Sequence, residues 1–155
     1  MKIETRLHDL GIKLPKPPKR FGNNVSGVVI RDLLFMSGCG PTRSDQSLIT
    51  GKVGRDLSAE QAYQAARLTA LNMLADAKAI LGDLDKIIKA VKILGLVNAI
   101  PEFKEHPKVI NGFSDLLLEI FGTAGVCARS AIGAGSLPFQ IAVEVEIIFQ
   151  IKTDQ

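Results

Sequence analysis

The stretch SAEQAYQAARLTALNMLADAKAILGDLDKIIKAVKILGLVN, residues 58–98, joins a long helical pattern directly to an apolar strand pattern. Ser58 is a suitable N-cap and Gln61 completes a capping box, so we expect a helix from about residue 59 to residue 81. The apolar face recurs at helical spacing through Ala62, Ala66, Thr69, Met73 and Ile80. Gly82 is then the expected helix stop.

The second half of that stretch, residues 86–97, is apolar on both faces if it forms a strand. We expect Ile88, Ala90 and Leu94 on one face. Their neighbours Ile87, Val91 and Ile93 would lie on the other face. A strand of this kind is typical of a position that is covered on both sides of a sheet.

Weaker patterns on either side complete the element order. The sequence predicts a short helix over residues 3–10, strands over 24–30, 33–38, 126–133 and 140–151, a long polar loop over 39–56, and a second long helix from Pro107. The order β-β-α-β-α-β-β is an α+β pattern, with two helices packed on one face of a mixed sheet. We expect a single domain over residues 1–155.

The last predicted strand shows why one chain is not enough to cover this sheet. Its helix-facing positions are Val143, Val145, Ile147, Phe149 and Ile151, and its other positions are Glu144, Glu146, Ile148 and Gln150. Two helices on one face leave the second face of the sheet uncovered. An uncovered apolar face indicates a partner subunit, so we expect a homo-oligomer.

Length and composition are ordinary for one globular domain. The chain has 155 residues, 46% of them hydrophobic and 23% charged, and a small net charge of +3 that is spread along the sequence. An obligate nucleic-acid-binding domain usually concentrates its cations on one face. One basic cluster, KLPKPPKR at 13–20, lacks interleaved aromatic residues, so residues 1–20 are interpreted as a short helix and a solvated proline-rich arm.

Cysteine and histidine usage argues against a metal site. Cys39 and Cys127 show no metal-binding spacing, and His8 and His106 lie far apart, so no metal or cofactor is expected. No signal peptide is expected, and the longest apolar stretch, 87–100, is too short to span a bilayer. The expectation is a reduced, cytoplasmic protein with no membrane contact.

One arginine stands out in CARSAIGAGSLPFQIAVEVE, residues 127–146. Arg129 is the only cation of the stretch, and small or apolar residues surround it. Burial of an unpaired guanidinium costs on the order of several kcal/mol. Arg129 could therefore pair with Glu144 or Glu146 across adjacent strands, or line a cleft and bind a ligand carboxylate bidentately. Spacing alone favours the ion pair.

Several motifs together resemble the RidA/YjgF family, also called the L-PSP family. ARSAIGAGSLPFQIAVEVEI is similar to that family's C-terminal signature, SGCGP at 37–41 is similar to its Ser-Gly-Gln-x-Pro, and residues 51–98 match its first long helix and third strand. LGIKLPKPPK resembles the longer subgroup of the family. The resemblance implies a chorismate-mutase-like fold and a homotrimer with a barrel core and three clefts between subunits.

The resemblance also implies an activity, because family members hydrolyse reactive 2-imino acids to keto acids and ammonia without a metal. In that reading Arg129 clamps the substrate carboxylate and Glu144 positions the attacking water. The remaining implied substrate-binding residues are Ser37, Gly38, Cys39, Asn24, Asn111 and Ala131.

This sequence departs from the family pattern at three positions. Asn24 replaces the tyrosine of the cleft, Cys39 replaces the glutamine after Ser-Gly, and Cys127 stands two residues before the arginine. Asn24 predicts a wider and wetter cleft that prefers bulkier imino acids. Cys39 is interpreted as a small buried residue in preference to a reactive thiol.

The departures leave more than one function open. A non-catalytic trimer that binds small carboxylates is one alternative, and a 2-aminomuconate-type deaminase is another. A ribonuclease has little support, because the sequence lacks a basic groove that bears aromatic residues.

Overall fold

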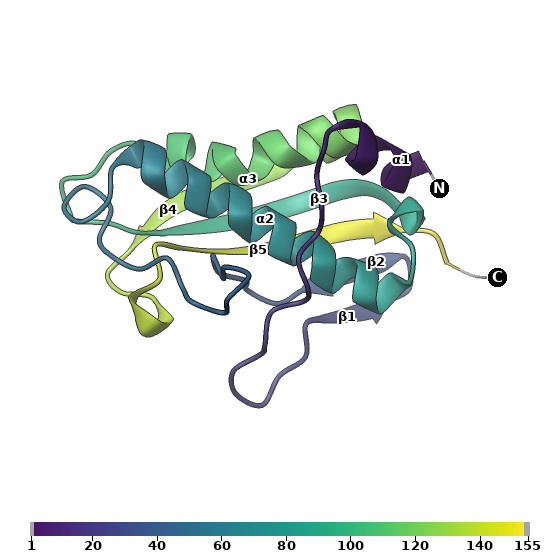
Figure 1. Ribbon diagram of the computed structural model, residues 1–155, viewed down its shortest axis with the longest axis horizontal. Coiled ribbons are helices and arrows are strands. Elements are labelled where there is room, and N and C mark those ends of the chain that lie inside the picture. The colour runs from purple at the N-terminus through teal and green to yellow at the C-terminus, as the bar shows by residue number, and fades with distance from the viewer. Residues whose placement is uncertain (1, 154–155) are drawn as a thin grey trace.

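Two long helices lie along one face of a five-stranded sheet in the computed structural model, which describes residues 2–153 (Figure 1). The helices are α1 (Lys2–Asp9), α2 (Ala59–Leu81) and α3 (His106–Phe121). The strands are β1 (Gly27–Ile30), β2 (Leu33–Met36), β3 (Ile87–Asn98), β4 (Ala128–Ala134) and β5 (Val143–Ile151).

The sheet has the order β1-β2-β5-β3-β4. Strands β3 and β4 run parallel, and the other neighbouring pairs run antiparallel. The predicted α+β class, with a mixed sheet and two helices on one face, is therefore confirmed. Several strands begin two or three residues later than expected. For β5 the reason is a 3₁₀ turn at Pro138–Gln140, which occupies the predicted start.

Helix α2 begins and ends as its sequence predicts. The Ser58 hydroxyl accepts from the Gln61 amide at 3.1 Å, and the Gln61 side chain accepts from the Ser58 amide at 2.9 Å. Gly82 follows with a φ of 79°, a conformation that suits glycine. The placement of Ile80 on the buried face is wrong, because its side chain is 37% exposed while Ala77 and Leu81 are buried instead.

Two irregularities in β3 change which side chains face the helices. The pairing of β3 with β5 shifts register between Ile87 and Lys89 and again between Ala90 and Lys92. Ile87, Ala90 and Ile93 are all buried as a result. The strict alternation expected from the sequence is therefore wrong in this half of the strand, since each bulge adds a residue to one strand only.

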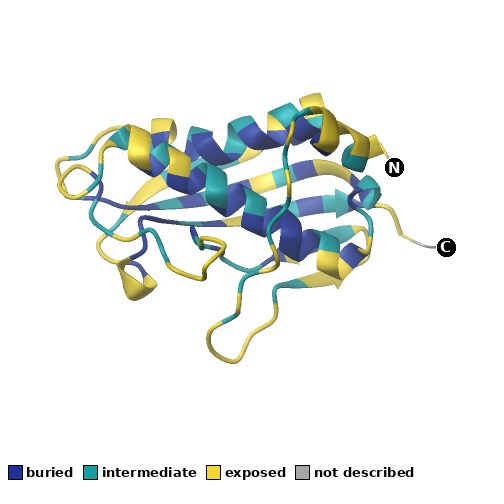
Figure 2. Cartoon of the chain, viewed as in Figure 1, coloured by how far each residue is buried: buried dark blue, intermediate teal, exposed yellow. Residues whose placement is uncertain are grey.

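The core lies between the helices and the sheet. Figure 2 shows buried residues along both α2 and α3, and residues 72–77 of α2 are all buried. The five alternate β5 side chains from Val143 to Ile151 are at most 4% exposed, as predicted. On the opposite face of the sheet, Phe35, Ile88 and Ile132 are 38%, 44% and 49% exposed. One chain thus leaves an apolar sheet face uncovered.

The two segments expected to be surface loops both contact the core. The arm that follows α1 crosses the outer side of α2 before the chain reaches β1 (Figure 1). In loop 39–56, Val53 is fully buried, and its amide donates to the Asn98 carbonyl at 2.7 Å. The loop is therefore anchored against the end of β3.

Close contact between α2 and α3 depends on Gly112. A Cβ atom at this position would lie 2.0 Å from the Tyr63 carbonyl oxygen on α2. Polar bonds fix the same helix pair, because the Tyr63 hydroxyl donates to Asp115 at 2.6 Å and Arg67 donates to both oxygens of Glu119 at 2.8 Å. The helices can approach this closely only because residue 112 has no side chain.

We predict that Gly112→Ala lowers the free energy of unfolding by about 3 kcal/mol, because backbone atoms of two packed helices must separate. Gly135→Ala is the matched control, since a Cβ there meets no atom within 4 Å. Urea unfolding at equal protein concentrations measures both variants. Equal midpoints for the two variants would contradict the close helix contact.

Candidate functional site

A pocket of about 270 Å³ lies beside the end of β2 and brings together four of the predicted site residues. We call it the Glu144 pocket. Its lining includes Arg20, Phe21, Asn24, Gly38, Cys39, Phe139, Ile141 and Glu144. The arm, the segment after β2, the 3₁₀ turn and β5 each contribute to this pocket, so it is assembled from parts that are distant in the sequence.

Glu144 is half-buried in this pocket. It alternates with the helix-facing valines of β5 and so projects from the face of the sheet that the helices leave open. Burial raises the pKa of the Glu144 carboxyl, the neighbouring Glu146 adds to the rise, and the Arg20 guanidinium opposes it. The acid therefore retains a proton at higher pH than an ordinary glutamate does.

Gly38 allows the Glu144 carboxyl to occupy its place. A Cβ atom on Gly38 would lie 2.5 Å from Oε1 of Glu144. That oxygen is the far end of a flexible side chain, so a methyl group would displace the carboxyl and leave the strands in place. Glycine at position 38 therefore leaves free the space that the Glu144 carboxyl occupies.

We predict that Gly38→Ala moves the Glu144 carboxyl without unfolding the protein. The pKa of Glu144 should fall toward the ordinary glutamate range, because the displaced carboxyl is better hydrated. Carboxyl carbon NMR across a pH titration measures this pKa, and the unfolding midpoint measures the fold. An unchanged Glu144 titration would show that the carboxyl does not depend on Gly38.

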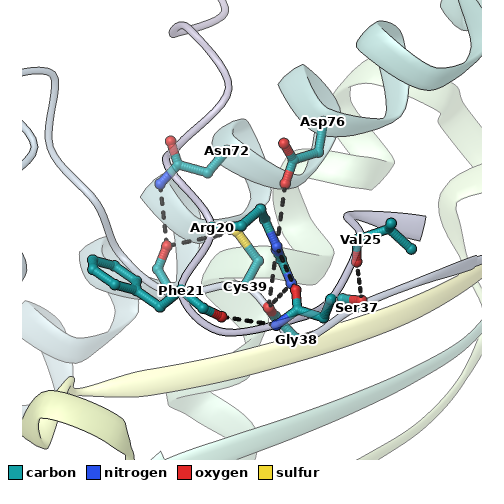
Figure 3. Close-up of polar contacts among 10 residues, drawn as sticks. Arg20, Phe21, Val25, Ser37, Gly38, Cys39, Asn72 and Asp76 are labelled. Carbon is teal, nitrogen blue, oxygen red and sulfur yellow. Dashed lines mark hydrogen bonds and ion pairs between the residues drawn. The ribbon is translucent and has the colours of Figure 1, made fainter.

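Arg20, the last residue of the basic cluster, lines the pocket. Figure 3 shows its side chain between Asp76 of α2 and Gly38. Its Nη1 atom is 3.7 Å from Oδ2 of Asp76, and Nη1 and Nη2 both donate to the Gly38 carbonyl at 3.4 Å. Its Nε atom donates to Oδ1 of Asn24 at 3.1 Å. The interpretation of the whole cluster as a solvated arm is therefore wrong for Arg20.

Two buried polar residues of α2 hold the surroundings of the pocket. Asn72 donates to the carbonyls of Gly40 and Thr42 at 3.1 and 2.9 Å, and Asp76 lies one turn further along the same side of the helix. Asp76 is 2% exposed, and burial raises its pKa, while Arg20 and a hydrogen bond from Ser26 oppose the rise. Neither residue was predicted from the sequence, although two polar residues inside an alanine-rich helical face are a readable signal.

Loss of Arg20 should make stability depend more steeply on pH. Asp76 has a raised pKa in the folded state, so the folded state loses stability as pH rises from the ordinary aspartate pKa of 3.8 through that raised pKa. Without Arg20 the folded pKa should rise further, and the loss should extend to higher pH. We predict that Arg20→Met costs about 1–3 kcal/mol of unfolding free energy at pH 7 and less at pH 4.

The matched control is Lys16→Met, which removes an exposed cation of the same arm. Chemical unfolding at pH 4, 5.5 and 7 measures all three proteins. Glu144 shares the guanidinium with Asp76, so Arg20→Met/Asp76→Asn separates their contributions. Parallel stability profiles for the wild type and Arg20→Met would contradict the coupling.

Asn24 and Ser37 each donate to a backbone carbonyl of the segment between the arm and β1. Asn24 donates from Nδ2 to the Phe21 carbonyl at 2.8 Å and accepts from Arg20, so it fastens the arm. Asn24 lines the pocket together with Arg20 and Phe21, and the wider, wetter cleft expected there stays a prediction. Ser37 lies just outside the lining, and its hydroxyl donates to the Val25 carbonyl at 2.6 Å.

Backbone hydrogen bonds of Cys39 connect the segment that follows β2 with strand β5. Its amide and carbonyl pair with those of Val145 at 2.9 and 3.0 Å, and its side chain is 3% exposed. Burial, followed by the charge of Asp76, raises the pKa of the thiol to about 12. Cys39 is therefore a neutral thiol at ordinary pH, in agreement with the expectation of a small buried residue.

Arg129 lies at the opposite edge of the sheet, on β4. Its Nη1 atom donates to Oδ1 of Asn111 at 2.8 Å and to Oγ of Ser114 at 3.1 Å, both on α3. Ala131 follows two residues later on the same side of the strand. Arg129, Asn111 and Ala131 thus form a second group, which contains only neutral partners for the guanidinium.

The predicted structural ion pair of Arg129 with Glu144 or Glu146 is wrong. Strand β3 lies between β4 and β5, so these residues are not on adjacent strands. Arg129 pairs in register with the helix-facing Ile93, whereas both acids lie on the other face of the sheet. Among residues 2–153, no ion pair of the structure involves Arg129.

Comparison with known proteins identifies the family. Residues 4–150 match the family model described as "YjgF/chorismate mutase-like, putative endoribonuclease". The chain belongs to the YjgF family. The resemblance drawn from the sequence motifs is thereby confirmed, and the chorismate-mutase-like fold with it.

Relatives of this YjgF-family chain match along almost their whole length. Protein TCP17 of Trypanosoma cruzi is 38% identical over 152 residues, covering 97% of this chain and 95% of TCP17. The crystal structure of Atu1372 from Agrobacterium tumefaciens is 42% identical, covers 98% of this chain and 93% of its own, and has a TM-score of 0.88. Escherichia coli TdcF, crystallised with bound serine, shares the fold at 21% identity and a TM-score of 0.63, with 89% and 94% coverage.

A larger cavity of about 830 Å³ lies between α1, the end of α3 and the start of β3, but none of the predicted site residues lines it. Within the described part of the chain, no three His, Cys, Asp or Glu side chains are grouped so as to hold a metal ion. No helix there has the length and apolar character to cross a membrane.

Proposed function

We propose that this YjgF-family protein hydrolyses 2-imino acids to keto acids and ammonia, in clefts between the subunits of a homotrimer. The observation that carries the proposal is the pair of unsatisfied groups in one chain. Arg129 has a guanidinium with only neutral partners, and Glu144 has a half-buried carboxyl with a raised pKa. One cation and one proton-accepting acid are the side chains that this reaction requires.

The chemistry follows from these two groups. The substrate carboxylate binds the Arg129 guanidinium through paired charge-assisted hydrogen bonds, and this contact orients the imine carbon. Glu144 accepts a proton from water as the water oxygen bonds to that carbon, and returns it to the imine nitrogen, which gives a carbinolamine. Glu144 then carries the hydroxyl proton to the amine nitrogen as the C–N bond breaks, so that ammonia leaves and the carbonyl of the keto acid forms. A raised pKa suits a group that both accepts and donates the proton.

A second subunit is needed because one chain holds the two groups apart. Arg129 is at the β4 edge and Glu144 is in its own pocket near the end of β2, with β3 between their strands. The exposed apolar side chains Phe35, Ile88 and Ile132 support burial of the open sheet face against other copies. In a cyclic assembly, Arg129 of one copy would meet the Glu144 pocket of the next.

One observation favours a binding protein as the second candidate. The Cys39 thiol is buried and neutral, and the Asn24 side chain is engaged with the arm, so neither offers the polar group that the family pattern has there. Such a protein would bind small carboxylates at Arg129 without hydrolysing them, and serine in TdcF is a ligand of that class. A 2-aminomuconate-type substrate would also present a carboxylate to Arg129.

Mixing two inactive variants tests the inter-subunit site. Arg129→Ala and Glu144→Gln should each abolish imine hydrolysis. If the subunits are unfolded together and reassembled in equal amounts, about one quarter of the sites should contain Arg129 from one copy and Glu144 from the next. We predict recovery of about one quarter of the wild-type rate, measured as ammonia released from imines that an amino-acid oxidase generates.

The controls separate the parts of the proposal. Arg129→Ala alone should weaken pyruvate binding by about 2–4 kcal/mol while sedimentation still shows a trimer. A stable monomer at micromolar concentration would refute the assembly. Trimers that regain no activity on mixing would refute the shared site, and a wild type that binds pyruvate but releases no ammonia would establish the binding protein.

A further inference from the structure

Two exposed aromatic rings meet at the mouth of the Glu144 pocket. Phe21 comes from the arm and Phe139 from the 3₁₀ turn before β5, and both line the pocket. Their ring centroids are 4.9 Å apart with an angle of 50° between the ring planes. The two residues are 58% and 61% exposed, so this contact leaves much of each ring open to solvent.

The backbone at Phe139 is strained. Phe139 has φ 56° and ψ 17°, and Gln140 has φ 57°, a left-handed conformation that bulky residues rarely adopt. Three hydrogen bonds hold it there. The buried Asn98 donates to Oε1 of Gln140 at 3.2 Å, the Gly51 amide donates to the Gln140 carbonyl at 2.9 Å, and the Ile141 amide donates to the Pro138 carbonyl at 3.2 Å. Strain kept in place by its surroundings is a feature of ligand sites.

Phe21 is also positioned through its backbone. Asn24 donates to its carbonyl at 2.8 Å, and the preceding residue, Arg20, is fixed to Asp76 and to the Gly38 carbonyl. Neither ring is therefore placed by the hydrophobic core. Both are held at the pocket mouth by polar contacts of the segments that carry them.

We propose that Phe21 and Phe139 form a subsite for the side chain of the ligand, and that this subsite selects an aromatic 2-imino acid or its keto acid. Selection of an aromatic imino acid for hydrolysis rests on the proposed function, whereas binding of an aromatic keto acid does not. Exposed ring edges and faces offer the offset and edge-to-face contacts that a third ring prefers. Ile141 and the neutral Cys39 line the same pocket and suit an apolar group.

The size of the pocket agrees with this ligand. A cavity of about 150 Å³ is enough to hold benzene. The Glu144 pocket measures about 270 Å³, which leaves room for the reacting carbon and a water next to Glu144. A substrate with a methyl side chain would leave both rings in water and gain nothing from them.

Binding of phenylpyruvate and pyruvate to the full-length protein tests the subsite. Isothermal titration calorimetry should show phenylpyruvate bound at least about tenfold more tightly than pyruvate. Phe139→Gly removes the ring and suits the positive φ, so it should fold. That variant and Phe21→Ala should each bring the affinity ratio close to one, because phenylpyruvate loses its contacts with the rings. A wild type without preference, or variants that keep the preference, would overturn the proposal.

Two further measurements distinguish the subsite from the reaction. Rates on imines generated from phenylalanine and alanine should show the same preference and the same loss in both variants. If no imine is hydrolysed while the affinity ratio still depends on the rings, the subsite stands and the proposed reaction fails. If the imines are hydrolysed without an aromatic preference, the subsite fails alone. Dissociation of the assembly in both variants would show that the rings are subunit contacts, and would overturn the subsite.

Discussion

Strand β3 lies between β4 and β5, and this position determines how far apart Arg129 and Glu144 are held. It is hydrogen-bonded to β5 on one side and to β4 on the other, and its helix-facing side chains Ile93 and Val97 are fully buried. A strand held in this way cannot move aside. The separation of Arg129 from Glu144 is therefore fixed by the sheet, and no change of rotamer brings the two groups together within one chain.

Helix α2 connects the stability of the fold to the shape of the pocket. Asn72 holds the segment after β2 and Asp76 faces Arg20 of the arm, so one turn of a core helix sets two walls of the pocket. A buried carboxyl near a single, partly exposed guanidinium is a poor source of stability, because desolvation offsets most of the attraction. Its value lies in fixing the arm, and with it Phe21, at one place on the pocket.

The sequence predicted the elements that local rules determine. The Ser58 capping box, the stop at Gly82 and the alternation of β5 need only the neighbouring residues. Family motifs also indicated Glu144, Gly38 and Arg129. The bulges in β3, the partners of Arg129 and the docking of Arg20 depend on which strands and helices become neighbours, and spacing carries no information on that. The positive φ of Phe139 could not be predicted either, because glycine and asparagine are the residues that usually adopt this conformation.

The electrostatics of the isolated chain point to a ligand that carries a carboxylate next to a basic nitrogen. Arg129 holds a positive charge that Asn111 and Ser114 solvate but do not neutralise. Glu144 is held in a place where its negative charge is unfavourable, with Glu146 nearby and Arg20 shared with Asp76. A carboxylate satisfies the first group, and a nitrogen that gains a proton as it leaves satisfies the second. In the proposed function, a 2-imino acid bound between two copies would bring its carboxylate to Arg129 and its nitrogen to Glu144.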